Sequence, residues 1–380
     1  MSEIRRGEET GMIHIRKGSP AQKLISLLSV CGEYPLCALS LLGDARWYRE
    51  TVRRLTMAET VRIGGENLQG KLLTLNGRGQ DRSVRLSSGA IPILTRIGAW
   101  DFYRDTQWVH KFPGGAHRDR RLRCGEAIGM SMEAGIECRP YRLSDITEAG
   151  QSDEPAFYCS TELKRAGGNE IRKLGYSRAV GALLTSDRIH AVYNTRGAVM
   201  KWLGRGEVRM RDDLAVLGQG RQADSCILFG RDEAQILKTF QAATDLRVRD
   251  FRMDAVYTRI YAVPLNRIGE RLLRLLVQPR FEERLLDLLF PPETRSYHRG
   301  VFPYDARIGE VYVQSFLNAD ICALNRFRQG MERYEGIYEI VCYPHQVSLL
   351  QAWLGKGVRL RVLPLDAVET AIGIGKGVVF

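Results

Sequence analysis

The sequence lacks the spacings that mark the common metal and nucleophile sites. Its eight cysteines form no CxxC pair and its six histidines show no HExxH or HxH spacing, which excludes zinc-finger and zinc-protease patterns. No GxSxG elbow is present, so hydrolysis by an activated serine is not expected. The glycine-rich run at 373–377 lacks the full Gly-x-x-x-x-Gly-Lys-Ser/Thr spacing of a phosphate loop. We therefore expect neither a metal ion nor a cofactor.

Long apolar segments are absent as well. No run approaches the roughly 20 residues of a membrane-spanning helix, and the first residues, MSEIRRGEETG, lack the apolar core of a signal peptide. Several cysteines lie among apolar residues, which is typical of buried free thiols in a reducing compartment. These features predict a cytoplasmic protein that does not contact a membrane.

Positive charge is concentrated in the first third of the chain. The 380 residues carry a formal net charge of +12. Residues 1–125 hold 21 Lys and Arg against 12 Asp and Glu, whereas the other 255 residues hold 35 against 32. Excess positive charge on one domain favours binding of a polyanion through counterion release. We expect nucleic acid rather than a membrane surface, because no basic amphipathic anchor accompanies the charge.

Two helices are predicted early in this basic region. The first covers residues 20–31, after the cap residue Ser19 and with proline at a tolerated first-turn position. The second covers residues 35–42 and is stopped by Gly43. Both precede the stretch that carries most of the functional prediction.

That stretch is a third predicted helix, Ala45–Leu55, which begins after the N-cap residue Asp44. Side chains at three- and four-residue spacing are expected to pack inward, namely Trp47, Thr51, Val52 and Leu55. Three arginines share a different, exposed face, namely Arg46, Arg49 and Arg53. A row of guanidinium groups on a helix suits a DNA major groove or a line of phosphates. An ordinary solvated face is the alternative explanation.

A two-stranded ribbon follows this helix. Residues 71–75 and 83–86 are predicted as strands around the turn signal Asn76-Gly77, with Arg78 and Arg82 at the polar tip. Three helices and a basic hairpin predict a winged helix-turn-helix in which all five arginines contact double-stranded DNA. Such proteins commonly bind paired half-sites, so a homodimer is expected.

The second part of the chain alternates strands and helices. Residues 179–184 and 189–194 are predicted as two strands joined by a turn, and 199–203 as an extension of their sheet. Between 338 and 363 a strand, a helix and a strand follow one another, which predicts two parallel strands. The expected fold class is α/β in several domains, with an N-terminal winged helix-turn-helix and a C-terminal α/β domain that has a mixed sheet.

The expected organisation has four parts: a flexible arm at 1–18, the winged helix-turn-helix domain with a helical extension at 19–140, a linker at 141–175 and the α/β domain at 176–380. The linker is inferred from an acidic run that ends in Pro155. Four arginines gather near the end of the second part, namely Arg118, Arg120, Arg121 and Arg123. A second phosphate contact and an exposed first helical turn both explain this cluster.

Several stretches carry a resemblance to a known family. In the first part they are the helix 45–55 and the hairpin 71–86, which closes with LSSG; in the second they are SRAVGALL at 177–184, AVYNT at 191–195 and MKW at 200–202. On these residues the chain resembles the replication-relaxation family carried by plasmids and conjugative elements of Gram-positive bacteria. The resemblance implies a DNA-binding protein of a mobile genetic element, acting in plasmid replication, conjugative transfer or its regulation, beside a relaxase or replication protein.

Two alternatives stay open beside a sequence-specific, non-enzymatic DNA-binding protein. One is a Mg²⁺-dependent nuclease with a restriction-endonuclease-like second domain, which needs two carboxylates and a lysine. Glu207, Asp224 and the triplet Glu162-Leu163-Lys164 are the candidates, although the triplet precedes both carboxylates and ordinary surface carboxylates explain them as well. The other alternative is an adaptor whose basic domain binds an acidic protein.

Histidines and aromatic residues complete the candidate set. His190 lies in a strand pattern and is expected in the core rather than as a ligand. His110 and His117 flank a glycine turn, where nothing else supports a metal site. Tyr193 and Trp202 could stack on an unpaired base, but packing in the core is the favoured role.

Overall fold

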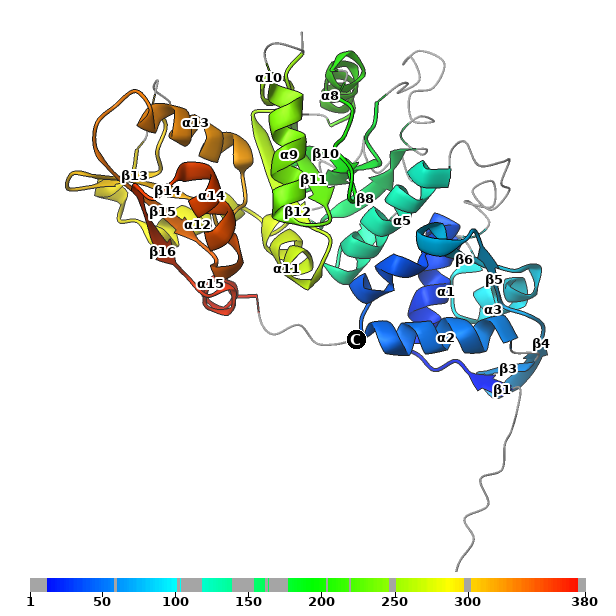
Figure 1. The fold of residues 1–380 in the computed structure, drawn as a ribbon. Helices are drawn as coiled ribbons and strands as arrows, with labels where there is room; N and C mark the ends of the chain where they lie inside the picture. Colours follow the sequence, from blue (N-terminus) through cyan, green and yellow to red (C-terminus); the bar gives the residue numbers. More distant parts are fainter. Residues whose placement is uncertain are drawn as a thin grey trace, which may run out of the picture. The chain divides into compact units, whose positions relative to one another are not determined.

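The computed structural model describes residues 12–57, 60–100, 103, 118–138, 154–160, 163, 177–202, 204–218, 220–245, 251–296 and 302–374 (Figure 1). The chain divides into two compact units, Met1–Glu133 (unit 1) and Ala134–Val379 (unit 2). Both units combine helices with sheets, and the chain is a mixed α/β protein with several mixed sheets. None of the described helices has both the length and the apolar character needed to cross a membrane.

Unit 1 contains short sheets packed against helices. Its described helices are α1 (Pro20–Cys31), the 3-10 helix η1 (Leu36–Leu41), α2 (Ala45–Met57), η2 (Gly79–Asp81), η3 (Ser88–Ala90), α3 (Ile91–Arg96) and α5 (Arg118–Glu133). Its described strands are β1 (Met12–His14), β2 (Glu33–Pro35), β3 (Thr60–Ile63), β4 (Glu66–Gln69), β5 (Leu73–Asn76) and β6 (Ser83–Leu86).

Capping residues determine where the first helices begin and end. The Ser19 hydroxyl accepts a hydrogen bond from the Gln22 N–H at the start of α1, and Gly32 ends that helix with a φ of 75°. The Asp44 carboxylate accepts from the N–H groups of Arg46 and Trp47, at 2.8 and 3.0 Å, and starts α2. These bonds satisfy N–H groups that have no partner within the helix, and both predicted helix starts are confirmed.

Three strands of unit 1 form an antiparallel sheet in the order β2-β6-β5. Asn76 pairs with Ser83 in the β5–β6 hairpin, so Gly77 to Arg82 form its tip, as the turn signal predicts. Strand β2 pairs with the other side of β6. A second sheet, β1-β3-β4, is built on a hairpin between α2 and β5, which the sequence did not indicate.

Unit 2 contains two larger sheets. Its described strands are β7 (Glu137–Cys138), β8 (Ala156–Cys159), β9 (Gly181–Leu184), β10 (Arg188–Asn194), β11 (Gln222–Gly230), β12 (Arg259–Pro264), β13 (Ala306–Ile308), β14 (Val311–Ser315), β15 (Ile337–Cys342) and β16 (Val358–Val362). The first sheet has the order β12-β11-β10-β9-β8-β7 and the second β13-β14-β15-β16. Both mix parallel and antiparallel pairs, and β15 and β16 are parallel, as predicted.

Helices cover these sheets and connect their parallel strands. The described ones are α8 (Arg205–Leu217), α9 (Glu233–Thr244), α10 (Met253–Val256), α11 (Arg267–Leu276), α12 (Phe281–Leu289), η6 (Pro292–Thr294), α13 (Ile321–Met331), η7 (Pro344–Gln346), α14 (Val347–Leu354) and α15 (Leu365–Ala371). Figure 1 shows α9 along the six-stranded sheet, where it contacts β11 and β12. The helix predicted within residues 338–363 is α14.

The expected domain limits differ from the structure in three places. The arm at 1–18 includes β1, whose neighbour Ile15 is buried; residues 1–11 lie outside the described part. The expected linker at 141–175 includes β8, which pairs with both β7 and β9. This strand was not predicted, because its four apolar residues directly follow an acidic run that ends in Pro155. The boundary between the units follows α5, at Glu133, rather than residue 140.

The predicted strand at 199–203 is also wrong. Residues 199–202 are irregular, and Trp202 turns into the core instead of extending the sheet. Its ring meets those of Tyr193 and Tyr257 edge to face, at centroid distances of 6.1 and 6.3 Å. All three side chains are fully buried, so the preferred prediction of core packing for Tyr193 and Trp202 is confirmed.

One buried carboxylate joins the two sheets of unit 2. Asp320 Oδ1 accepts from the N–H groups of Cys322 and Ala323 at the start of α13. The same oxygen accepts from the Ile260 N–H in β12, at 3.1 Å. Next to it, the Ala262 N–H donates to the carbonyl of Ala319 at 2.9 Å. The edge strand β12 of the six-stranded sheet and the first turn of α13, which covers the four-stranded sheet, therefore share the Asp320 carboxylate as a hydrogen-bond acceptor.

His190 lies in the core of the six-stranded sheet, as predicted. Its Nδ1 is 2.9 Å from the Ser225 hydroxyl, and its ring meets Tyr261 edge to face. Burial, with a smaller contribution from the positive charge of Arg188, lowers the pKa of His190 to about 3. The imidazole is therefore neutral in the folded protein at pH 7.

This neutral histidine predicts a loss of stability in mild acid. The unfolded chain binds a proton on His190 near pH 6.5, whereas the folded chain does so only near pH 3. Lowering the pH through this window therefore favours the unfolded state, by about 2 kcal/mol between pH 7 and pH 5. Urea unfolding followed by circular dichroism at both pH values measures the change.

The matched variant is His190→Asn, which keeps a polar atom near Ser225 but binds no proton. Its free energy of unfolding should depend less on pH than that of the parent, by about 2 kcal/mol between pH 7 and pH 5. His345, whose pKa burial lowers to about 4, contributes equally to both proteins and cancels. Identical pH dependence in the two proteins would contradict the assignment of a neutral, buried His190.

Candidate nucleic-acid interface

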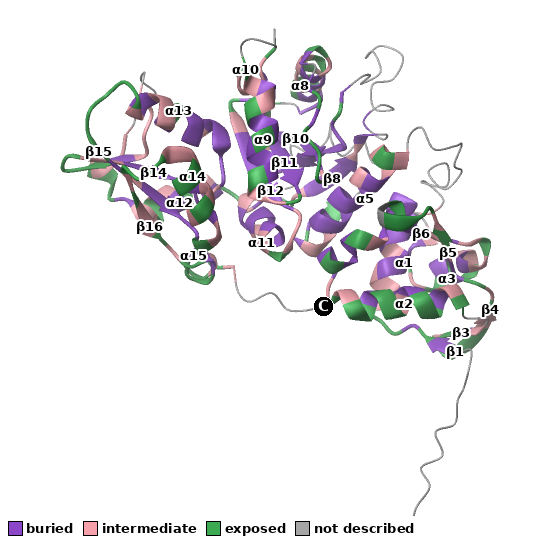
Figure 2. Ribbon diagram, in the orientation of Figure 1, coloured by how far each residue is buried: buried purple, intermediate pink, exposed green. Residues whose placement is uncertain are grey.

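Helix α2 has one buried face and one cationic face. Tyr48, Val52 and Leu55 are buried at four- and three-residue spacing and contact the rest of unit 1. Four arginines on the helix are exposed, namely Arg46, Arg49, Arg53 and Arg54. In Figure 2 much of the α2 ribbon has the colour of exposed residues. The predicted exposure of Arg46, Arg49 and Arg53 agrees with this arrangement, and Arg54 was missed.

The expected inward position of Trp47 is wrong. Its side chain is 69% exposed, and the neighbouring Tyr48 occupies the core position instead. Both residues are aromatic and fit an inward stripe at similar spacing, so the sequence does not distinguish the two helix rotations. The structure selects the rotation that buries Tyr48 with Val52 and Leu55.

The exposed arginines differ in how freely they can bind an anion. Arg53 donates to both carboxylate oxygens of Glu50, at 2.8 and 2.6 Å, and this bond lowers the pKa of Glu50. Among the described residues, Arg46, Arg49 and Arg54 have no ion-pair partner. A bidentate carboxylate competes with phosphate for the same guanidinium edge, so Arg53 is the least available of the four.

The hairpin tip adds two exposed cations to unit 1. Arg78 and Arg82 are both exposed and flank the short helix η2. Strand β5 of the hairpin contacts α2. All five predicted DNA-binding arginines therefore lie in unit 1, on α2 and on the β5–β6 hairpin that contacts it.

A buried ion pair holds this hairpin in place. Glu33, at the start of β2, is fully buried. Its Oε1 accepts from Arg118 Nε at 2.9 Å, from Asn76 Nδ2 at 3.3 Å and from the Ser83 hydroxyl. Arg121 approaches the other carboxylate oxygen, at 3.8 Å. Both ends of the hairpin's closing pair, Asn76 and Ser83, are thus bound to one carboxylate.

Arg118 extends the same network to the hairpin tip. Its Nη2 donates to the Ser83 hydroxyl at 2.8 Å, and to the carbonyls of Asn76 and Asp81. Gly77, with a φ of 76°, lies so close to this guanidinium that an added Cβ would collide with it. The glycine of the turn signal is therefore required for the contact as well as for the turn.

The arginine cluster at the start of α5 is mainly structural. Arg118 and Arg121 approach Glu33, and Arg123 pairs with Asp119 at 2.7 Å. Burial lowers the pKa of Arg121 and of its neighbour Arg85, while the charge of Glu33 opposes that shift. A phosphate contact is therefore not the main role of Arg118 or Arg121. The two explanations offered from the sequence, a second phosphate contact and an exposed helical turn, did not include a buried carboxylate partner.

The candidate nuclease carboxylates have structural partners. Glu207 is fully buried, and its two oxygens accept from the N–H groups of Gly204 and Arg178, at 3.0 and 3.2 Å. Asp224 pairs with Arg188 at 3.0 Å and accepts from the Thr258 hydroxyl. Within the described ranges, no three His, Cys, Asp or Glu side chains gather as metal ligands would. Glu162 and Lys164, like His110 and His117, lie outside those ranges.

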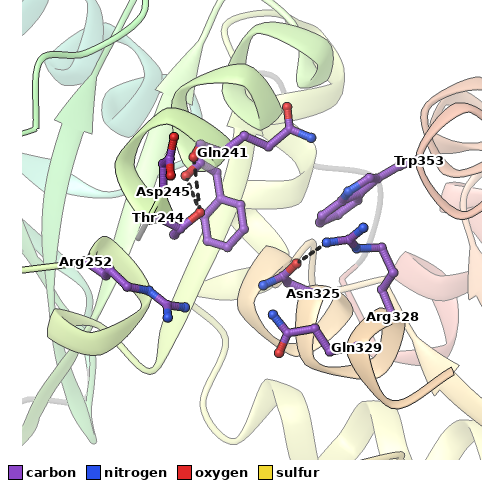
Figure 3. A pocket seen from close by; sticks show the side chains of 9 residues that line it. Gln241, Thr244, Asp245, Arg252, Asn325, Arg328, Gln329 and Trp353 are labelled. Carbon is purple, nitrogen blue, oxygen red and sulfur yellow. Dashed lines mark hydrogen bonds between the residues drawn. The ribbon is translucent and has the colours of Figure 1, made fainter. Parts of the chain in front are cut away.

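A cavity of about 440 Å³ lies in unit 2 between α9 and α13 (Figure 3). Arg252 projects into it from one side and Arg328 from the other, beside Trp353. Each arginine is already neutralised, since Arg252 donates to Asp254 and Arg328 lies 3.4 Å from Glu332 and over the Trp353 ring. The cavity therefore offers less free charge than the surface of α2.

No protein-family model, curated protein or solved structure matches this chain. What the chain binds is therefore inferred from the geometry of unit 1.

The buried ion pair predicts a large effect of a small substitution. Glu33→Gln keeps the shape of the side chain but leaves Arg118 with no counter-charge in a site that is mostly shielded from water. Breaking a buried pair on one side costs about 3–5 kcal/mol, so unit 1 should lose about that much stability. Hydrogen exchange of the β6 amides measures it, with the β11 amides of unit 2 as an internal reference.

Glu50→Gln is the matched control because it breaks an exposed Arg–Glu pair in the same unit. Protection of β6 should stay unchanged in this variant, since exposed pairs contribute little. Equal protection of β6 in the parent and in Glu33→Gln would show that the ion pair does not hold the hairpin.

Proposed function

We propose that residues 20–86 form a winged helix that binds double-stranded DNA. The order of α1, β2, η1, α2 and the β5–β6 hairpin supports this assignment, as does the pairing of β2 with β6. In a helix-turn-helix, the second helix of the motif enters the major groove and its N-terminal residues reach the bases. We assign α2 as the second helix of such a motif, because η1 directly precedes it in the chain.

The observation that carries the proposal is the surface of α2 together with the hairpin tip. Arg46 and Arg49 extend from the first turns of α2, where base or phosphate contacts are made. Arg78 and Arg82 extend from the hairpin and would clasp the neighbouring backbone or minor groove. Arg53 contributes less because Glu50 binds it.

The biological setting is proposed from the sequence resemblance. We propose a sequence-specific, non-enzymatic DNA-binding protein of a mobile genetic element, acting in plasmid replication, conjugative transfer or its regulation. Unit 2 would serve assembly, either as a homodimer or with a relaxase or replication protein. The structural use of Glu207 and Asp224 gives no support to a nuclease built on these two carboxylates.

Removing two arginines should weaken duplex binding in a salt-dependent way. For Arg46→Ala with Arg49→Ala, the slope of log affinity against log salt should fall by about 2, since each lost phosphate contact removes about 1. Affinity for a short duplex at 0.1 M salt should fall roughly 10- to 100-fold. Fluorescence anisotropy titrations at several salt concentrations measure both quantities.

The control replaces two exposed cations of unit 2, Arg333→Ala with Lys356→Ala, which changes the net charge equally. This control should bind like the parent. Equal losses in the two double variants would mean that total charge, rather than α2, governs binding. If an acidic protein binds the parent and duplex DNA does not compete for the site, the adaptor alternative replaces the proposal.

A further inference from the structure

We infer that Trp47 stacks on an unpaired base, so that the surface of α2 binds DNA most tightly where a base is out of its pair. This inference rests on the proposed function, because it assigns a ligand feature to the same helix. It originates in the structure, since the sequence placed Trp47 in the core.

The rotation of α2 keeps the indole in solvent. Tyr48 is 3% exposed, Val52 4% and Leu55 fully buried, which fixes the rotation of the helix about its axis. Trp47, one residue before Tyr48, is turned about 100° away from it and is 69% exposed. Within the described part of the chain, no aromatic ring or cation contacts this indole. A large flat apolar surface is therefore displayed without a protein partner.

Arg54 lies on the same side of α2 as this ring, two helical turns later, and Arg46 lies about 100° round the helix from it. Both arginines are exposed and have no ion-pair partner among the described residues. The nearer neighbours of Trp47 on its own face are two carboxylates, each already bound. Asp44 caps the N–H groups of Arg46 and Trp47, and Glu50 is paired with Arg53. Aromatic rings interleaved with cations are the arrangement by which proteins hold single-stranded nucleic acid, with phosphates on the cations and bases on the rings.

The geometry favours an unpaired base over a paired one. In a duplex, both faces of each base are covered by its stacking neighbours, so a ring on a convex helix reaches only base edges. An unpaired base offers its whole face to the indole. Stacking is tolerant of sequence because every base has such a face, so the inference can be tested without knowing the DNA site.

The experiment compares two single-stranded oligonucleotides with the same number of phosphates, one of thymidines and one with abasic sites throughout its centre. Trp47→Ala should lower affinity for the thymidine strand roughly 5- to 150-fold, the range for stacking of one base. For the abasic strand, the parent and Trp47→Ala should bind alike, since only phosphate contacts remain. Trp47→Phe should restore most of the affinity because it supplies a ring.

Met57→Ala is the matched control, since Met57 is 68% exposed on the same helix but has no ring. It should bind both strands like the parent. Equal losses for Trp47→Ala on the two strands, or no binding of the thymidine strand by the parent, would overturn the inference.

The arginine variants separate this outcome from failure of the proposed function. Arg46→Ala with Arg49→Ala should weaken binding to the thymidine strand, the abasic strand and the duplex. If that loss is found while Trp47→Ala acts on no strand selectively, stacking is rejected and the cationic interface stands.

Discussion

The contact between Glu33 and Arg118 is the interaction on which the geometry of unit 1 depends. The Glu33 carboxylate extends from the first residue of β2 and binds the closing pair of the β5–β6 hairpin and the first turn of α5. An ion pair taken out of water is stable only when its remaining hydrogen-bonding positions are also satisfied. Here Asn76 and Ser83 donate to Oε1 of Glu33, and the carbonyls of Asn76 and Asp81 accept from Arg118. The second carboxylate oxygen, Oε2, is buried without a hydrogen bond from any described residue and has the Arg121 guanidinium 3.8 Å away. The hairpin can therefore carry exposed arginines at its tip while its base stays rigid.

Much of unit 1 could be predicted because its signals are local. Ser19 and Asp44 act as caps through contacts within four residues, and Asn76-Gly77 begins a turn whose closing pair, Asn76 and Ser83, is seven residues apart. The Glu33–Arg118 pair joins residues 85 positions apart, and no local pattern distinguishes such a carboxylate from a solvated one. Trp47 was misplaced for a related reason: two adjacent aromatic residues give nearly equal periodicity, and only tertiary packing decides which one is buried.

The functional candidates of unit 2 illustrate the same limit. Glu207 and Asp224 have the residue type that a metal site needs, but the sequence does not show what their oxygens accept. In the structure those oxygens serve backbone N–H groups, an arginine and a threonine hydroxyl. His190 and Tyr193 were assigned to the core correctly, because the apolar strand pattern around them is a strong indicator of burial. Trp202 was also assigned to the core correctly, although the strand predicted around it is absent.

The shared acceptor at Asp320 has a consequence for how unit 2 comes apart. Separating β12 from the first turn of α13 would leave the Ile260 N–H without its acceptor and expose the apolar core between the two sheets. Neither sheet can then open alone at low cost, although the chain between them passes through α11 and α12. The two sheets of unit 2 should behave as a single cooperative folding element, whose amides exchange together rather than sheet by sheet.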